Sequence, residues 1–388
     1  MAVTTIGAGL SLWRNVRVQR FVVQAVFAAA LAAFGYYMVT QARELGLGFD
    51  FLNDRAGFNI SNQVWTNYDS NDRRRDLYIA GVVNTIRIAG VGIALATLLG
   101  LVAGVARLSG NWLLSRLALV YVETARNIPL LVQIVFWYIA VLLQLPRLAD
   151  SMTAFDMAFL SVRGLALPWV QTENGFGLWL IFLTVAAVAA VAVRQWRGKR
   201  EERTGQPSYP NWVALGTFVA IALVGFAIAG GPLSPDRPEI GERGFRYDGG
   251  LFISAEFTAL LLALVTYTGA FIAEIVRGSI QAVPKGQTEA SAALGLNPFQ
   301  RLNLVILPQA LRIMIPPLTS QYLNLTKNSS LAVAIAFPEL VGVSRTIMNN
   351  TGQTIPMFVI VMATYLLMSL IISLVMNTLH RRTTLVEH

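Results

Sequence analysis

The sequence contains no cysteine, and its two histidines, His380 and His388, both lie at the C-terminal end. Without cysteine there are no disulfide bonds, thiolate metal sites or cysteine nucleophiles. With both histidines in the tail, a histidine-centred catalytic or metal site is not expected in the body of the chain. Charge is also scarce, because only 13% of the 388 residues are charged, against about 25% in soluble domains. This deficit indicates a chain whose outer surface faces lipid.

Hydrophobic residues make up 55% of the sequence and gather in long runs. A helix that crosses a membrane needs about 20 mostly apolar residues. The sequence predicts eight such helices, of which the seventh is interrupted by polar residues: 21–42, 78–107, 128–145, 178–194, 211–230, 256–277, 315–344 and 355–379. We therefore expect an all-α membrane protein.

The basic residues predict the orientation of these helices. Cytoplasmic loops carry an excess of Lys and Arg, and the net charge is +9. Basic residues cluster before the first helix, between the fourth and fifth, and after the last: Arg14, Arg17, Arg20, Arg194, Arg197, Lys199, Arg200, Arg203, Arg381 and Arg382. An even number of helices places all three clusters on one side, so both termini are expected in the cytoplasm.

On the side expected to be extracytoplasmic, one basic cluster departs from this charge pattern. The same side has three loops. Arg73, Arg74 and Arg75 lie on the side expected to be extracytoplasmic. The loops there, about 43–77, 145–177 and 231–255, are rich in Gly, Pro, Asn and Asp. They look too small to form a folded domain outside the membrane.

Residues 283–308, expected in the cytoplasm, carry the start and stop signals of two short helices. We call this stretch the coupling segment. Gly295 suits the left-handed position just after a first helix. Asn297 can cap the next helix, and Pro298 fits its first position. Pro308 is expected to end that second helix.

Small residues on the first of these helices allow another surface to approach closely: Ala290, Ser291, Ala292 and Ala293. Such a surface suits docking into the groove of a partner protein. A re-entrant or packing hairpin without a partner is the alternative, and local physics favours neither.

The coupling segment resembles the EAA loop in the permease subunits of ATP-binding-cassette (ABC) importers. That pattern is Glu-Ala-Ala, then Gly, then Ile-x-Leu-Pro, and this chain has Glu289-Ala290-Ser291, Gly295 and Val305-Ile306-Leu307-Pro308. It departs by Ser291 for Ala and Val305 for Ile. The resemblance implies a type I importer fold in which this segment forms a coupling helix seated in a groove of an ATPase subunit. Glu289, Ala290, Gly295, Leu307 and Pro308 are its matching residues.

Further stretches resemble the polar amino acid (histidine/glutamate/glutamine) branch of that family: Asn84-Thr85, Gly104–Ser109, Tyr121–Leu130 and Leu325–Leu331. The likeness covers about 78–144 and 256–380. Most members of this branch have five spans, whereas this chain adds an N-terminal span and a two-helix insertion. That architecture is similar to the general L-amino acid or glutamate/glutamine/aspartate/asparagine permeases of Gram-negative bacteria, which pair with a second, similar permease.

These observations divide the chain into five regions. They are an N-terminal tail, first helix and periplasmic loop (1–77), the first core part (78–144), the insertion (145–255), the second core part with the coupling segment (256–380), and a cytoplasmic tail (381–388).

Polar residues at membrane depth form the candidate substrate pathway, because such residues are costly there and tend to face a cavity or a partner. Lys327 lies within a polar run of the seventh helix that also contains Asn324, Thr326, Asn328 and Ser329. We expect this run to line the pathway and Lys327 to face a substrate carboxylate or a carboxylate side chain. The alternative is a buried structural pair, with Glu339 as the partner of Lys327. Arg87 either extends outward to the interface or contributes to an anion-attracting path.

The chain has no Gly-x-x-x-x-Gly-Lys-Ser/Thr phosphate loop, so it is not expected to hydrolyse ATP or to hold a cofactor or metal itself. The resemblance implies that ATP and Mg bind to a partner ATPase dimer, and that a periplasmic amino-acid-binding protein delivers substrate at the bacterial inner membrane. Transport would then proceed by alternating access between two permease subunits.

Two other functions compete with this interpretation. An ion-coupled secondary transporter would show broken helices at matching positions of two repeats, and the sequence suggests a break only in the seventh helix. A membrane-embedded transferase would need converging histidines or paired carboxylates, and the acidic residues are scattered.

Overall fold

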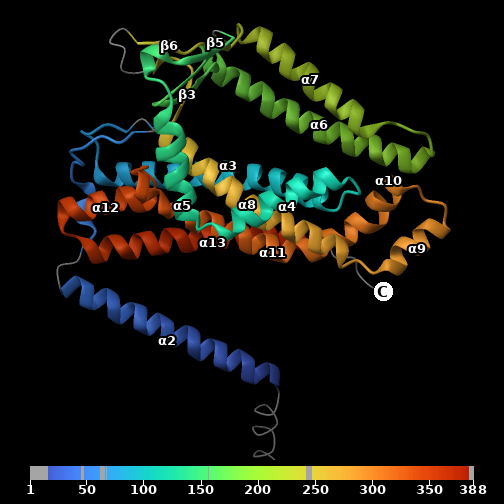
Figure 1. Cartoon of the computed structure of the whole chain (residues 1–388), viewed down its shortest axis with the longest axis horizontal. Helices are drawn as coiled ribbons and strands as arrows, with labels where there is room; N and C mark the ends of the chain where they lie inside the picture. The colour runs from blue at the N-terminus through green and yellow to red at the C-terminus, as the bar shows by residue number, and fades with distance from the viewer. Residues whose placement is uncertain are drawn as a thin grey trace, which may run out of the picture. The chain divides into compact units, whose positions relative to one another are not determined.

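The computed structural model describes residues 16–44, 48–61, 66, 68–155, 157–241 and 247–383. The expectations for 1–15 and 384–388, Arg14 included, lie outside these residues. The described chain is mostly helical, as predicted (Figure 1). It groups into two compact units, Met1–Ala118 with Phe271–His388, and Leu119–Ala270.

The helical elements follow one another along the whole chain. The α-helices are α2 (Val16–Glu44), α3 (Arg74–Arg107), α4 (Trp112–Asn127), α5 (Leu130–Val135), α6 (Phe176–Thr204), α7 (Pro210–Ile228), α8 (Ala255–Gln281), α9 (Lys285–Ala293), α10 (Pro298–Arg301), α11 (Leu307–Asn328), α12 (Leu340–Thr351) and α13 (Thr354–Thr383). The 3₁₀ and π segments are η1 (Asp50–Asn53), η2 (Phe136–Val141), η3 (Leu142–Gln144), η4 (Leu148–Asp150), η5 (Leu302–Ile306) and η6 (Ser329–Ile335).

Among the described residues, six helices are long and apolar enough to cross a membrane, or seven if one bent pair counts as a single span. The second, fourth, fifth, sixth and eighth expected spans correspond to α3, α6, α7, α8 and α13. The first lies within α2, whose apolar stretch, Val22–Tyr37, is shorter than a full span. The prediction of a multi-pass helical membrane protein is therefore confirmed, while the expected number of eight is not confirmed among the described residues.

The third and seventh spans differ from the prediction. The third is the second half of a bent pair, Trp112–Asn127 and Leu130–Gln144, which meet at 105°. Ile128 precedes Pro129, and a residue before proline is disfavoured in the helical conformation, so the helix breaks there. The expected seventh span, 315–344, is wrong at its end: the spanning stretch is Pro298–Ile335, and Leu340 begins a separate helix, α12.

In the first unit, α3 is the central helix. It packs against α12 through Leu77, Ala80, Leu340, Val343 and Ile347, all of which are buried. Helix α13 runs beside α11 in the same unit (Figure 1). Gly104 brings α3 unusually close to α8, because a Cβ atom there would lie 2.7 Å from the carbonyl oxygen of Ala273.

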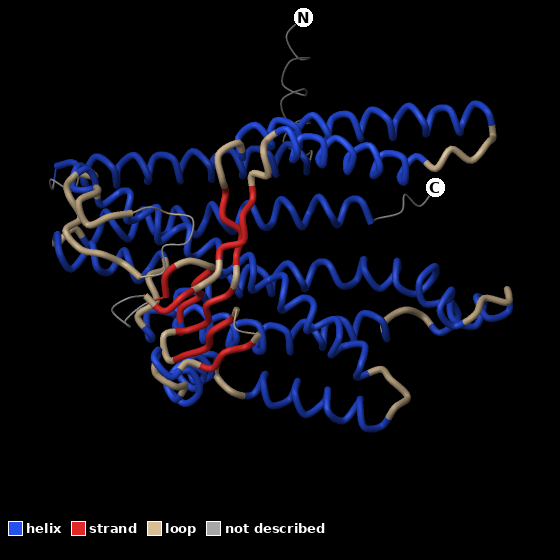
Figure 2. Tube along the Cα trace, turned by 90° about the horizontal axis from the view of Figure 1, so that it is seen from above, coloured by secondary structure: helices blue, strands red, loops and turns tan. Residues whose placement is uncertain are grey.

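In the second unit, the insertion forms a helical hairpin and short strands. The strands are β1 (Met152–Ala154), β2 (Ala158–Ser161), β3 (Gly164–Leu167), β4 (Trp169–Thr172), β5 (Leu233–Asp236), β6 (Glu239–Ile240), β7 (Tyr247–Asp248) and β8 (Leu251–Ser254). They form an antiparallel sheet in the order β1-β2-β3-β8 and two pairs, β4-β5 and β6-β7 (Figure 2). This sheet in the loops 145–177 and 231–255 was not expected from the sequence, although the loops belong to the second unit and do not form a separate one. The two loops fold together, since Gly164 pairs with Ser254 across the hairpin insertion.

The loop before α3 accounts for the exceptional Arg73–Arg75 cluster. The Arg74 guanidinium forms an ion pair with Asp54 at 2.8 Å and donates to the carbonyl of Phe51 at 2.9 Å. The backbone N–H groups of Ala56 and Gly57 donate to the carbonyls of Asp72 and Ser70. Arg74 thus fastens this loop to the start of α3.

Candidate functional site

The two short helices of the coupling segment, α9 and α10, are joined by a connection with a cap at Gly295 and another at Asn297. Gly295 has φ +78°, and its N–H donates to the carbonyl of Ala292 at 2.9 Å at the end of α9. The Asn297 side chain accepts from the N–H of Gln300 at 2.9 Å, while the Gln300 side chain accepts from the N–H of Asn297 at 3.1 Å. This reciprocal capping box satisfies two backbone donors at once. The predicted roles of Gly295, Asn297 and Pro298 are confirmed.

The second helix does not end at Pro308, so that prediction is wrong. The chain continues from α10 through the π segment Leu302–Ile306 into α11, where Pro308 lies in the first turn. A first-turn proline costs little because its missing N–H would have no partner there. In the π segment the backbone hydrogen bonds join residues five apart instead of four. This change just before Leu307 allows Pro308 to lie in the first turn of α11.

The tip of the coupling segment presents apolar side chains to its surroundings. Leu294 is 81% exposed and Phe299 is 72% exposed. Glu289 and Ala290 are exposed on α9 beside them. Gln309 on α11 donates to the side chain of Gln287 at 3.1 Å and so ties the tip back to the spanning helix. A rigid tip with uncovered apolar side chains suits a docking surface better than a flexible linker.

Helix α11 carries a polar stripe on an exposed face. Ser320, Asn324 and Lys327 are exposed and follow each other at helical spacing. Thr326 and Ser329, by contrast, are buried and donate to backbone carbonyls of Tyr322 and Thr326. Asn328 is half-buried. The structure therefore places two of the five predicted pathway residues of this run, Asn324 and Lys327, on one open face.

A break in the helix follows this stripe and is held by side chains of α3. Ala336 has φ +56°, and the chain turns there into α12. Asn84 donates to the carbonyl of Pro338 at 3.0 Å. Thr85 accepts from the N–H of Leu340 at 3.0 Å. These bonds satisfy backbone groups that a lipid environment would leave without partners.

Glu339 is fully buried at this break and caps α12. Its carboxylate accepts from the N–H groups of Val341 at 2.9 Å and Gly342 at 2.7 Å, and from the Tyr365 hydroxyl at 3.3 Å. Lys327 is exposed, and no ion pair joins it to Glu339 in the described chain. The alternative that these two residues form a buried pair is therefore wrong, since the helix N-terminus already stabilises the carboxylate of Glu339 without a cation.

Arg87 lies in the same buried network. Its side chain is only 7% exposed and donates to the side-chain oxygen of Asn84 at 3.0 Å. It therefore stays inside the unit instead of extending to the interface, and it does not share the open face of Lys327. Through Asn84 it supports the backbone at Pro338.

At the other end of α3, a carboxylate joins two helices. Glu274 on α8 forms ion pairs with Arg107 on α3 and with Arg277 on its own helix. The pair with Arg277 follows from its spacing in the sequence, whereas Arg107 adds a link between helices. The Arg277 guanidinium also donates to the Gln281 side chain at 2.6 Å.

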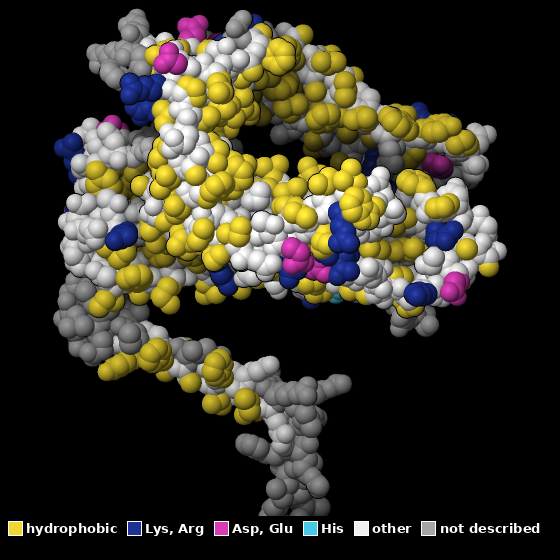
Figure 3. Space-filling view, in the orientation of Figure 1, with side chains coloured by type: hydrophobic (Ala, Val, Ile, Leu, Met, Phe, Trp, Pro, Cys, Tyr) yellow, Lys and Arg dark blue, Asp and Glu magenta, His cyan; other side chains and the backbone are white. Residues whose placement is uncertain are grey.

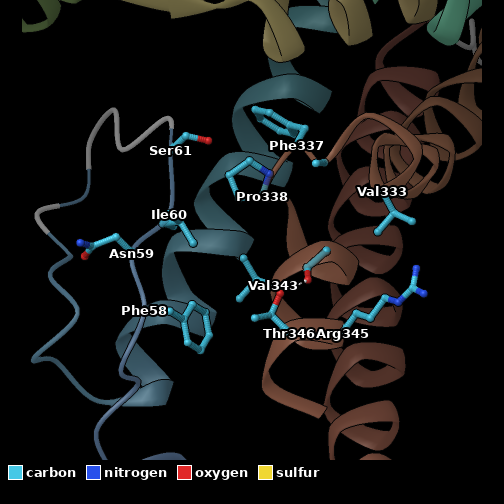
Figure 4. A pocket seen from close by; sticks show the side chains of 12 residues that line it. Phe58, Asn59, Ile60, Ser61, Val333, Phe337, Pro338, Val343, Arg345 and Thr346 are labelled. Atoms are coloured by element: carbon cyan, nitrogen blue, oxygen red, sulfur yellow. Dashed lines mark hydrogen bonds between the residues drawn. The ribbon is translucent and has the colours of Figure 1, made fainter. Parts of the chain in front are cut away.

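A pocket of about 340 Å³ lies between the loop 58–61 and α12 (Figure 4). Phe58 and Ile60 line it from the loop, and Val343 and Thr346 line it from α12. Arg345 is the one charged residue among the described residues that line it, and its side chain extends away from the loop.

Sequence reasoning missed three contributors to this region: Ser320, Asn84 and the capping role of Glu339. Ser320 was detectable, because it lies at helical spacing from Asn324 and Lys327. Glu339 directly after Pro338 and before an amphipathic run is also a recognisable start of a helix. The contact of Asn84 with Pro338 joins residues far apart in the sequence and left no local signal.

The matching family model and the relatives found by sequence agree on the kind of protein. The family described as "Binding-protein-dependent transport system inner membrane component" matches residues 205–385. The general L-amino acid transport system permease protein AapQ of Rhizobium johnstonii is 46% identical over 340 residues, covering 88% of this chain and 84% of the relative. The glutamate/glutamine/aspartate/asparagine transport system permease protein BztB of Rhodobacter capsulatus is 38% identical over 409 residues, covering 97% of this chain and 95% of the relative. A chain from the crystal structure of an amino acid ABC transporter with histidines aligns with 79% of this chain and 94% of its own length, at 20% identity and a TM-score of 0.46.

Proposed function

This chain belongs to the permease family of amino acid ABC transporters, and on that premise we propose that it imports L-amino acids from a periplasmic binding protein by alternating access. The substrates are polar or acidic amino acids, or a broad range that includes them. The relatives AapQ and BztB are described as general L-amino acid and glutamate/glutamine/aspartate/asparagine permeases, which supports this substrate class.

The observation that carries the proposal is the capped, apolar tip of the coupling segment. The caps at Gly295 and Asn297 make the tip rigid, and Leu294 and Phe299 stand out from it. In water these side chains favour burial against a partner. A rigid tip can transmit a displacement, whereas a flexible loop would absorb it. The partner is an ATPase dimer, which binds ATP and Mg; this chain needs no cofactor of its own.

The polar stripe of α11 supports a pathway at the interface with a second permease subunit. Lys327 lies within the spanning stretch Pro298–Ile335 and is uncovered in the described chain. A cation at membrane depth is costly against lipid. A water-lined path shared with an identical or similar permease would solvate it and leave it free to attract a substrate carboxylate.

In the proposed cycle, ATP-driven closure of the ATPase dimer moves the coupling segments of the two permeases toward each other. The permeases rock about their shared path and open it to the substrate-loaded binding protein. Release of the nucleotide products closes the path to the binding protein and opens it to the cytoplasm. Both termini of this chain lie on the cytoplasmic side.

An ion-coupled secondary transporter is the rival function. In the described part of the chain one span is broken, where α4 and α5 meet at a bend, while α11 and its 3₁₀ extension end at Ala336 before α12 begins. The expectation of a break only in the seventh helix was therefore wrong. Membership of the ABC permease family nevertheless disfavours an ion-driven mechanism.

A matched pair of substitutions tests the coupling role. Phe299→Asp places a charge on the tip and should abolish co-purification of the ATPase and ATP-dependent uptake in proteoliposomes, because an aspartate at a desolvated contact is strongly unfavourable. Phe155→Asp is the control: Phe155 is 95% exposed on the turn between β1 and β2, and this change should leave both properties as they are. ATPase binding that survives Phe299→Asp would disprove the coupling role.

A further inference from the structure

The α6–α7 hairpin has two helices of unequal length. Helix α6 has 29 residues and α7 has 19, which correspond to about 43 Å and about 28 Å at 1.5 Å per residue. Their apolar parts are of similar length, since charged residues of α6 begin only at Arg194. The last turns of α6 therefore extend beyond the apolar part of the hairpin.

One side of this extension is occupied by the return of the chain to α7. Arg197 donates to the carbonyl of Ser208 at 2.8 Å, and the Ser208 hydroxyl donates to the carbonyl of Arg197 at 2.8 Å. The same hydroxyl lies 3.3 Å from the Glu201 carboxylate. Arg197 and Glu201 thus have a structural role, because they fasten the loop 205–209.

The opposite side of the extension is basic and uncovered. Trp196 is followed at helical spacing by three exposed cations, Lys199, Arg200 and Arg203. The Arg200 guanidinium lies 5.9 Å from the centre of the Trp196 ring, and Trp196 is 60% exposed. Across the described residues, none of these three cations forms an ion pair. We call this surface the basic face of α6.

An apolar groove continues the basic face into the membrane-spanning part of α6. This groove is a shallow, open depression of about 320 Å³ on α6, and its described lining is Thr184, Val185, Val188 and Ala189. Val185, Ala189 and Ala192 fall on the same helical face as Trp196. Hydrophobic side chains cover much of the hairpin in the space-filling view (Figure 3). The groove lies about 16 Å along the helix from Lys199.

We propose that this face of α6 is a binding site for one anionic phospholipid. Lys199, Arg200 and Arg203 bind the phosphate and the anionic headgroup, Trp196 lies at the level of the glycerol, and an acyl chain occupies the groove at Val185 and Val188. Each part has a physical reason: basic residues attract anionic headgroups, tryptophan prefers the interface, and an apolar groove at membrane depth is filled by hydrocarbon.

Two alternatives account for less of the surface. Basic residues near a helix C-terminus stabilise the helix dipole, which explains Arg203 but not the alignment of Trp196 and the groove with it. An acidic partner protein would bind the cations but would not need the apolar groove beneath them. The lipid site gives the insertion a role that does not depend on the transport activity.

The experiment uses the full-length protein, purified in detergent and stripped of lipid. Native mass spectrometry measures the binding of phosphatidylglycerol and of phosphatidylcholine with the same acyl chains. Each Lys or Arg near an anionic surface contributes about fivefold to binding. The double substitution Lys199→Gln/Arg203→Gln should therefore weaken phosphatidylglycerol binding about 30-fold and leave phosphatidylcholine binding unchanged.

The matched control is Arg194→Gln, which removes one exposed positive charge from the other side of α6 and should leave phosphatidylglycerol binding intact. Val188→Trp, which fills the groove, should weaken the binding of both lipids. Equal affinity of the parent protein for the two lipids would overturn the proposal. An equal loss of phosphatidylglycerol binding in the control would also overturn it. So would a Lys199→Gln/Arg203→Gln variant that still binds phosphatidylglycerol but no longer binds the ATPase.

Discussion

Among single residues, Lys327 bears most directly on the transport mechanism. Its side chain is exposed on α11, together with Ser320 and Asn324, although it belongs to a helix that crosses the membrane. A lysine placed against lipid costs free energy, up to roughly 2.5–3.5 kcal/mol at the centre of a spanning helix. The cation therefore needs water, an anion or a polar partner on this face, and a substrate carboxylate provides one.

Replacing Lys327 by alanine should impair the uptake of acidic amino acids most. A hydrogen bond to a charged group contributes about 1.5–3 kcal/mol, so Lys327→Ala should slow aspartate uptake roughly 10- to 100-fold when substrate is below saturation. Lys327→Arg should retain part of the activity because it keeps the charge. Uptake is measured in proteoliposomes that contain the complete transporter, with aspartate and glutamine compared.

The neighbouring Ser320→Ala serves as the control, because it changes the same face without removing charge. Unchanged uptake rate and selectivity in Lys327→Ala would contradict the proposed contact with the substrate. Equal slowing for aspartate and glutamine, without a change in ATPase binding, would exclude recognition of the side-chain carboxylate. It would leave Lys327 with the α-carboxylate that both substrates share or with a general role in the path.

Single residues also mark the limit of prediction from sequence. The charge of Lys327 within a polar run of an apolar stretch was evident from the sequence. The absence of a bond between Lys327 and Glu339 was not evident, because Glu339 is satisfied by backbone N–H groups of α12 and by Tyr365. Which partner a buried carboxylate takes depends on the geometry of the break, and the residue type alone does not determine it.

At the scale of elements, the contact of α3 with α8 depends on a glycine. A Cβ atom at Gly104 would lie 2.7 Å from the Ala273 oxygen and 2.7 Å from the Val276 Cβ atom. The ion pair between Arg107 and Glu274 lies one turn further along α3 and joins the same two helices. The close approach at Gly104 therefore helps to bring this pair together.

Gly104→Ala should separate the two helices and destabilise the protein. Overpacking of this kind typically costs about 1–3 kcal/mol. Gly90→Ala is the matched control in the same helix, since nothing lies within 4 Å of the position of its Cβ atom, and alanine favours a helix by up to about 1 kcal/mol over glycine. Thermal unfolding in detergent should show a lower midpoint for Gly104→Ala and an equal or higher one for Gly90→Ala. The opposite order would refute the packing role of Gly104.

Elements were predictable where their determinants are local. The helix ends at Gly295 and Asn297 followed from single residues, because capping involves neighbours in the chain. The sheet of the insertion was missed, since β3 pairs with β8 only after the hairpin has brought Gly164 and Ser254 together. The continuation through Pro308 was missed because a π segment precedes it, and no residue pattern announces such a segment.

At the scale of the whole molecule, the membrane-spanning helices present two kinds of uncovered surface. The α6–α7 hairpin is apolar on its outer faces, with Val188 71% exposed and Leu223 63% exposed, as expected where lipid is the neighbour. Helix α11 exposes the polar stripe Ser320, Asn324 and Lys327. The family was predictable from the coupling segment, but this contrast between faces required the structure, because the sequence does not state which side of α11 its neighbours cover.

The contrast predicts where a second permease subunit binds. A photo-crosslinking amino acid, p-benzoylphenylalanine, in place of Asn324 should attach this chain to a neighbouring permease in the assembled transporter, because a polar face at membrane depth needs a protein or water neighbour. The same amino acid in place of Val188 should react with lipid and yield no protein adduct. Adducts are identified by mass spectrometry of the excised gel band. A protein adduct from position 188 with none from position 324 would mean that the polar stripe faces away from the subunit interface, and the path would have to lie within a single chain.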